Sequence, residues 1–136
     1  MPTFSEKSKK ILSTCHIDLQ ILFDEVIKHF DCKPTEGHRG KEAQNKAYAE
    51  GKSQLKYPDG NHNAFPSNAV DVYPYPIDMK HTSRFYWFGG FVMGIAEMLY
   101  MQGKISHKVR YGGDWDGDKD INDQKFNDLV HFEIVE

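Results

Sequence analysis

The stretch Asn-His-Asn-Ala-Phe-Pro-Ser-Asn-Ala-Val-Asp-Val-Tyr-Pro, residues 61–74, organises the rest of the chain. Its apolar run Ala69-Val70-Asp71-Val72 predicts a short buried strand. Because an isolated buried carboxylate costs several kcal/mol, Asp71 needs a partner. A metal ion is one candidate partner. His62 in the same stretch and His131 near the C-terminus would complete a His/Asp/His set.

Length and composition indicate one small globular unit. The 136 residues, with 39% hydrophobic and 13% aromatic side chains, suffice for a real core, and we expect a single domain over residues 1–136. A net charge of -3 means that the chain has no excess of basic residues, which argues against a nucleic-acid partner. The longest apolar stretch, around residues 85–101, is broken by glycines and Glu97, which argues against membrane insertion.

The N-terminus and the cysteines bear on the compartment. The first ten residues are polar and no apolar segment follows them, so we expect a cytoplasmic protein without a signal peptide. Two cysteines are too few for a disulfide framework. Cys15 and Cys32 are expected to be reduced thiols of the core.

Hydrophobic periodicity predicts an α+β fold. Helices are expected over 5–30 with a break and a cap near Ser13-Thr14, over 41–50 with Gly51 at the end, and from a cap at Thr82 or Ser83 to about 103. Strands are expected after Asp31, over 69–73, over 109–111 and over 130–135. Irregular alternation of these elements favours α+β over a doubly wound sheet. Gly90 and Gly94, one turn apart, predict that the long helix packs closely against another element.

Several side chains have the types that metal chemistry and hydrolysis require. Zinc at a catalytic site takes three ligands from His, Asp, Glu or Cys, and His62, Asp71 and His131 supply such a set. Asp128, three residues before His131, is placed to act as a general base toward an attacking water. Arg39 follows a predicted strand and is suited to bind a carboxylate or a developing oxyanion.

Each of these patterns also has an ordinary structural interpretation. Taken by itself, Asp128 is interpreted as a solvent-exposed acid in a loop. Arg39, taken by itself, is interpreted as a surface arginine. The alternating acids resemble oxygen-rich calcium loops, although they do not form an EF-hand, and equally fit a solvated loop whose Asp114 or Trp115 supports a wall of the site. These acids are Asp114, Asp116, Asp118 and Asp120. Four histidines are expected to be structural or exposed: His16, His29, His81 and His107.

In order along the chain, these pieces resemble the zinc D-alanyl-D-alanine carboxypeptidase and L-alanyl-D-glutamate endopeptidase family, which includes VanY-like enzymes and single-domain phage endolysins. The resemblance covers most of residues 5–136, and Gly60 stands where the family usually carries a serine two residues before the first zinc histidine. The matching stretches are 36–39 with Gln44 and 51–53, 62–74, 111–115 and 128–134.

The resemblance implies a function, a fold and a role for each residue. His62, Asp71 and His131 would bind zinc, Asp128 would be the catalytic base, and Arg39 would steady the substrate carbonyl. Gln44 and Ser53 would bind substrate. The implied fold is a small central antiparallel sheet with packed helices, shared with the hedgehog signalling domain.

The expected protein is therefore a zinc peptidase of peptidoglycan stem peptides, acting as a monomer on the cell wall after the membrane is breached. The bond cut stays open between L-Ala-D-Glu, D-Ala-D-Ala and another. Two alternatives remain: a non-catalytic, zinc-binding recognition domain of the hedgehog-like fold, and a zinc-free protein whose acidic loop binds calcium for stability.

Overall fold

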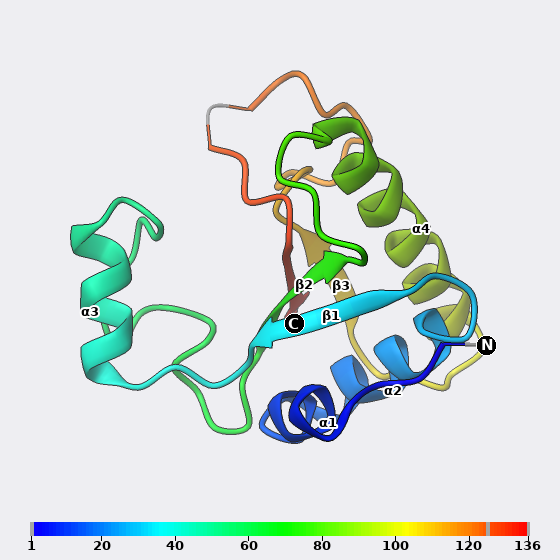
Figure 1. Ribbon diagram of the computed structural model, residues 1–136, viewed down its shortest axis with the longest axis horizontal. Helices are drawn as coiled ribbons and strands as arrows, with labels where there is room; N and C mark the ends of the chain where they lie inside the picture. The colour runs from blue at the N-terminus through cyan, green and yellow to red at the C-terminus, as the bar shows by residue number, and fades with distance from the viewer. Residues whose placement is uncertain (1, 125, 136) are drawn as a thin grey trace.

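The computed structural model describes residues 2–124 and 126–135. Within them the helices are α1 (Glu6–Leu12), α2 (Ile17–Val26), α3 (Lys41–Ala49) and α4 (Thr82–Met101). The strands are β1 (Cys32–Glu36), β2 (Ala69–Pro74), β3 (Lys108–Tyr111) and β4 (His131–Val135). The strands form one antiparallel sheet in the order β1-β2-β4-β3 (Figure 1). The predicted α+β architecture is confirmed.

The core lies between one face of the sheet and helices α2 and α4. Alternation along each strand sends Val70 and Val72 of β2 and Phe132 of β4 into it. Phe132 is fully buried and meets the rings of Phe23 and Phe88 edge to face, at centroid distances of 5.4 and 6.1 Å. The same alternation turns the polar residues of β2 and β4 to the opposite face, where a site can form.

Helix α3 lies apart from this core. Figure 1 shows it beyond the end of β1, on the far side of the sheet from α4. Only Gln44 of this helix is buried, which agrees with the absence of large aliphatic side chains from its sequence. The helix and the loop that follows it form one side of a cleft, described below. No helix among the described residues is long and apolar enough to cross a membrane.

Three local predictions need correction. Helix α2 is capped by His16, whose Nδ1 accepts a hydrogen bond from the Asp18 amide at 3.0 Å, whereas Ser13 is the C-cap of α1. Helix α4 begins at Thr82, so the residue before it, His81, is the N-cap. Strand β2 includes Pro74, which pairs with Cys32 of β1, an edge strand.

The predicted close packing at Gly90 and Gly94 is also wrong. Among the described residues, no atom outside the local helix backbone lies within 4 Å of where a Cβ would stand at either position. The close approach occurs one residue earlier, at Gly89, where a Cβ would overlap the Tyr111 ring. Gly89, and neither Gly90 nor Gly94, therefore allows the close approach of α4 to β3.

Candidate metal centre and catalytic site

Sheet register places Asp71 directly opposite His131. Strands β2 and β4 pair antiparallel with Asp71 facing His131 and with Val70 facing Phe132, so the polar pair lies on the face away from the core. On the other side of β2, a bulge in β1 brings Glu36 opposite Asp71. A row of three polar side chains thus crosses three strands, although the residues lie far apart in sequence.

His62 reaches this row from the long loop before β2. Its Nδ1 lies 2.7 Å from the carbonyl oxygen of Gly37, and its own carbonyl accepts from the Arg39 amide at 2.7 Å. Because a carbonyl only accepts, Nδ1 carries the proton and Nε2 keeps its lone pair. That Nε2 lies 3.3 Å from Asp71 Oδ1.

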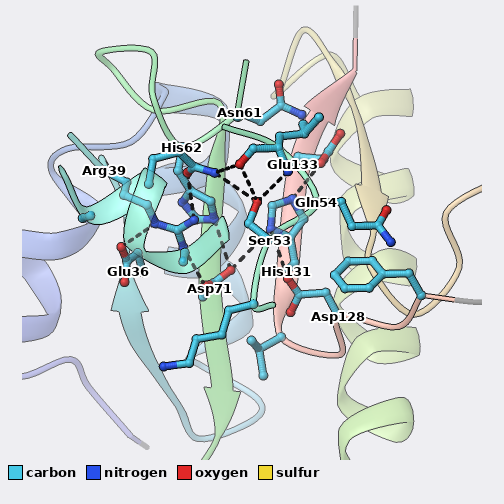
Figure 2. Close-up of a pocket in the computed structure, with 18 of the residues that line it drawn as sticks. Glu36, Arg39, Ser53, Gln54, Asn61, His62, Asp71, Asp128, His131 and Glu133 are labelled. Atoms are coloured by element: carbon cyan, nitrogen blue, oxygen red, sulfur yellow. Dashed lines mark hydrogen bonds and ion pairs between the residues drawn. The ribbon is translucent and has the colours of Figure 1, made fainter. Parts of the chain in front are cut away.

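His131 is oriented in the same way, with its two ring nitrogens exchanged. Its Nε2 lies 2.7 Å from Glu133 Oε1, and its Nδ1 lies 3.4 Å from Asp71 Oδ1. In both histidines, therefore, one ring nitrogen is held by an outer partner and the other ring nitrogen faces Asp71. We call His62, Asp71 and His131 the sheet set (Figure 2).

The sheet set has the donors and the spacing that zinc requires. Two buried atoms in it, His62 Nε2 and Asp71 Oδ1, have no hydrogen-bond partner among the described residues. Zinc bonds of about 2.0–2.1 Å in a tetrahedral arrangement separate neighbouring ligand atoms by about 3.3–3.4 Å. The separations between Asp71 Oδ1 and the two histidine nitrogens match that value.

The electrostatics of the sheet set favour a positive charge at its centre. Burial alone would raise the pKa of Asp71, but His131 and His62 outweigh burial and hold that pKa well below its usual range. Burial disfavours a charged His131, but Asp71 and Glu133 outweigh it and raise the pKa of His131 to about 9. The negative charges that raise the pKa of His131 would also stabilise a bound cation. Such a cation must displace the proton on the His131 nitrogen that binds it.

Asp128 lies beside the sheet set, as the Asp-x-x-His spacing requires. Its Oδ2 is 3.9 Å from His131 Nδ1, and the side chain is partly exposed in the cleft. Burial raises the pKa of Asp128, and the charge of Asp71 raises it further. A carboxylate with a raised pKa, beside a candidate metal centre, has the properties of a general base.

Arg39 is held in place by acceptors on three sides. Its Nε donates to Glu36 at 2.8 Å, one Nη donates to the Gln44 side chain at 2.9 Å, and the other lies 3.7 Å from Asp71 Oδ2. Gln44 is 1% exposed and also donates to Ser53 and to the carbonyl of Leu55. Gln44 therefore supports both Arg39 and the loop after α3.

The sheet set opens into a cleft of about 880 Å³. One side consists of α3 and the loop from Glu50 to Asn61, which includes Ser53, and the other of β4 with Trp115 and Phe126. The Trp115 ring lies 5.4 Å from the His131 ring, and its indole N–H donates to the Phe126 carbonyl at 2.8 Å. The predicted wall residue Trp115 thus lines the cleft.

Glu133, Arg110 and Glu36 support the site without a role predicted from the sequence. Glu133 is 3% exposed and contacts His131, while Arg110 contacts Glu133 through Nε at 3.1 Å and Nη2 at 2.6 Å. One signal was available, because the alternation in 130–135 puts Glu133 on the same face as His131. The partners Arg110 and Glu36 follow from strand register, which the sequence does not reveal.

The acidic loop brings three of its four predicted calcium ligands together. Ligand atoms of Asp114, Asp116 and Asp118 lie within 4.8 Å of one another, whereas Asp120 is outside this group. Asp114 Oδ2 accepts from the Lys119 amide at 2.9 Å, but the buried Oδ1 has no partner among the described residues.

A second His/Asp/His group lies at the start of α2, and its main polar atoms already make hydrogen bonds within the protein. We call it the helix set: His16, Asp18 and His107. Asp18 Oδ2 accepts from the amides of Ser106 and His107 at 3.0 Å and contacts His107 Nδ1 at 2.7 Å. His16 Nδ1 caps the helix. These bonds tie the α4–β3 connection to α2 and account for the set without an ion.

Comparisons with known proteins identify a family and a similar fold. The family model described as phage L-alanyl-D-glutamate peptidase matches residues 2–135. Among solved structures, the L-Ala D-Glu endopeptidase ChiX of Serratia marcescens is similar, with a TM-score of 0.70 and 21% identity over 97% of this chain and 89% of that chain. At this identity the likeness shows the fold. The comparison with curated proteins gave no match.

Proposed function

Because the chain belongs to the phage L-alanyl-D-glutamate peptidase family, we propose that it is a zinc-dependent hydrolase of the L-Ala-D-Glu bond in peptidoglycan stem peptides. The observation that carries the zinc dependence is the pair of buried atoms without partners, His62 Nε2 and Asp71 Oδ1. A buried polar atom without a hydrogen bond is costly, and an ion bound there would remove that cost. With His131 Nδ1 they make the three protein ligands of an open catalytic site.

The residues around the sheet set have distinct tasks in this reaction. Zinc, when bound, supplies a Lewis acid that acidifies a water and polarises the scissile carbonyl. Asp128 takes a proton from the attacking water as the new C–O bond forms. It then returns that proton to the leaving amine as the C–N bond breaks. Arg39, fixed by Glu36 and Gln44, stabilises the negative charge that develops on the carbonyl oxygen.

The cleft, of about 880 Å³, is large enough to hold a short peptide. Its lining includes the sheet set, Arg39 and Asp128, so a peptide bound in it would lie near all the proposed catalytic residues. Ser53, on the α3 side, is positioned to contact such a peptide, and Gln44 acts on it through Arg39. We further propose that the protein acts as a monomeric endolysin on the cell wall, once the membrane is breached.

The test is the variant Asp128→Asn on purified peptidoglycan. It should keep the fold and about one zinc per chain, while the rate of wall lysis falls roughly 10²–10⁴-fold, the usual range for losing a general base. Asp24→Asn, on the exposed face of α2, is the matched control and should keep full activity. Mass spectrometry of the released fragments identifies the bond that is cut.

Three results would contradict the proposal in different ways. Near-full activity of Asp128→Asn would remove the base assignment. Zinc binding with no cleavage by the wild-type protein would favour the non-catalytic recognition domain. Absence of zinc from the purified protein would remove the metal assignment altogether.

The acidic loop supports a second cation, calcium, bound through Asp114, Asp116 and Asp118. The specific observation is the buried Asp114 Oδ1 without a partner among the described residues, since Ca²⁺ takes carboxylate oxygens as ligands. Asp120 lies outside this group, and its Oδ1 accepts from the Asn122 amide at 2.9 Å. A calcium titration monitored by calorimetry should show binding by the wild type and none by the double variant Asp116→Asn/Asp118→Asn. Equal calcium binding by the two proteins would contradict this site.

A further inference from the structure

Glu133 divides its carboxylate between two neighbours on the sheet. Oε1 contacts His131 Nε2 at 2.7 Å, and Oε2 accepts both hydrogen bonds from Arg110. The register that places Arg110 opposite Glu133 and His131 two residues away on the same face fixes all three side chains. In Figure 2 Glu133 lies above His131, on the side away from Asp71.

We propose that Glu133 is a positioning residue of the metal centre, which keeps the proton of His131 on Nε2 so that Nδ1 faces the ion. The inference rests on the proposed function, because it assigns His131 as a ligand. An ionised carboxylate has only acceptor atoms, so whatever faces it must donate. Without Glu133, the carboxylates of Asp71 and Asp128 would draw a proton to the Nδ1 side instead.

The geometry makes a carboxylate necessary at position 133, and an amide of the same shape would not serve. An amide has one acceptor and one donor end. With its oxygen toward His131, its NH₂ would face the Arg110 donors, and with the ends exchanged it would donate to His131 Nε2 and favour the wrong tautomer. Either arrangement loses one of the two contacts that a carboxylate makes.

Arg110 keeps this carboxylate in place. Glu133 is nearly fully buried, and a buried charge persists when it is paired. The Arg110 side chain is 42% exposed, and its guanidinium also lies 6.0 Å from the Trp115 ring, so it connects Glu133 with the wall of the cleft. Arg110, Glu133 and His131 form a chain of contacts that ends at the proposed ion.

The test measures zinc affinity by chelator competition, together with the ring proton on His131 Nε2 in the ¹⁵N-labelled, zinc-loaded protein. Glu133→Gln should weaken zinc binding about 10–100-fold, the range for a residue that supports a metal ligand. It should also shift or remove the Nε2 proton resonance. Glu97→Gln, an exposed carboxylate on α4, is the matched control and should change neither.

A second variant separates positioning from a merely structural effect. Adding Arg110→Gln to Glu133→Gln lets the two amides pair and leaves the oxygen at position 133 free for His131. We expect zinc affinity to recover at least about twofold over Glu133→Gln alone, the lower end for coupling between contacting residues. Glu133→Asp retains the charge and should therefore lose less zinc affinity than Glu133→Gln. If Glu133→Gln does not fold, Glu133→Asp is measured in its place.

The outcomes distinguish this inference from the proposed function. If the wild type binds zinc and the position 133 variants bind it equally tightly with an unchanged Nε2 proton, the positioning role is wrong and the metal centre stands. If the double variant is as weak as or weaker than Glu133→Gln, the pairing between Arg110 and Glu133 is not the mechanism. A wild-type protein that binds no zinc refutes both.

Discussion

The sheet set and the helix set contain the same residue types, yet the structure satisfies them in opposite ways. In the helix set the Asp18 carboxylate accepts two backbone N–H groups and contacts an imidazole, and His16 caps a helix. In the sheet set the equivalent hydrogen bonds point outward. His62 bonds to Gly37 and His131 bonds to Glu133, so the lone pairs that remain all face one point.

This difference shows what makes a histidine and aspartate cluster a candidate metal site. Both sets have ligand atoms within 4.8 Å of one another, so proximity does not separate them. What separates them is whether the inward atoms are already bonded. Neutral imidazole binds a metal through the nitrogen without a proton, and the outer partner decides which nitrogen that is. The outer partners of the sheet set leave that nitrogen facing inward.

The largest effect should come from removing the carboxylate of each set in turn. Asp71→Asn replaces a charged ligand atom by a neutral one, so we expect zinc affinity to fall by more than the roughly 100-fold limit for supporting residues. Activity on peptidoglycan should disappear with it. Asp18→Asn changes the same residue type in the helix set and should keep about one zinc per chain. Elemental analysis and chelator competition on both variants measure the contrast.

Either of two results would break this comparison. Retention of zinc by Asp71→Asn at wild-type affinity would show that the sheet set does not hold the ion. Loss of zinc from a folded Asp18→Asn protein would show that the helix set takes part in metal binding.

A smaller effect, on the free energy of unfolding, is expected when the carboxylate of the helix set is removed. Asp18→Ala leaves the amides of Ser106 and His107 without their acceptor and releases the α4–β3 connection from α2. Leaving such groups unsatisfied costs about 1–3 kcal/mol in the free energy of unfolding. Urea unfolding measures this loss, with Asp24→Ala on exposed α2 surface as the control. A change below about 0.5 kcal/mol, typical of surface substitutions, would contradict the structural role of Asp18.

The contrast between the two sets also marks how far sequence reasoning reached. Asp71 and His131 could be selected because each is a polar residue within a short, largely apolar run. His62 and Asp128 could be selected by residue type and by their spacing from Asp71 and His131. The family and the α+β fold predicted from those motifs are confirmed. Their roles as ligands and base stay predictions, to which the structure adds that the four side chains lie together.

What the sequence could not supply was the identity of the outer partners. The pairing of Asp71 with His131, and of Glu133 with Arg110, depends on the register of strands that are distant along the chain. The acceptor for His62 is a backbone carbonyl, at Gly37, which carries no signature of residue type. The misplaced packing at Gly90 has the same origin, because periodicity gives the faces of a helix but not the partner on each.

The smallest effect of a substitution is expected at Cys15, which precedes the helix set along the chain but has a thiol whose pKa depends on Asp71 of the sheet set. Its Sγ lies 4.0 Å from the Ala69 carbonyl of β2. Burial raises the pKa of its thiol to about 11; Thr14 lowers it and the charge of Asp71 raises it again. The thiolate is the reactive form, so alkylation of folded protein at pH 8 should be roughly 100-fold slower than for a free thiol, from a pKa difference of about 2 units.

The sign of the pH effect follows from that shift. A pKa raised on folding stabilises the folded protein below the unfolded value of 9.0, and this contribution is lost between about pH 9 and 11 as the thiol ionises. Metal-free Asp71→Asn removes the nearby charge and should therefore increase the alkylation rate of Cys15, whereas Asp18→Asn should not. Mass spectrometry of the Cys15 peptide over time measures the rates. Equal rates in the two variants would mean that Asp71 does not influence the thiol, and that the sheet set is electrostatically screened from the helix beside it.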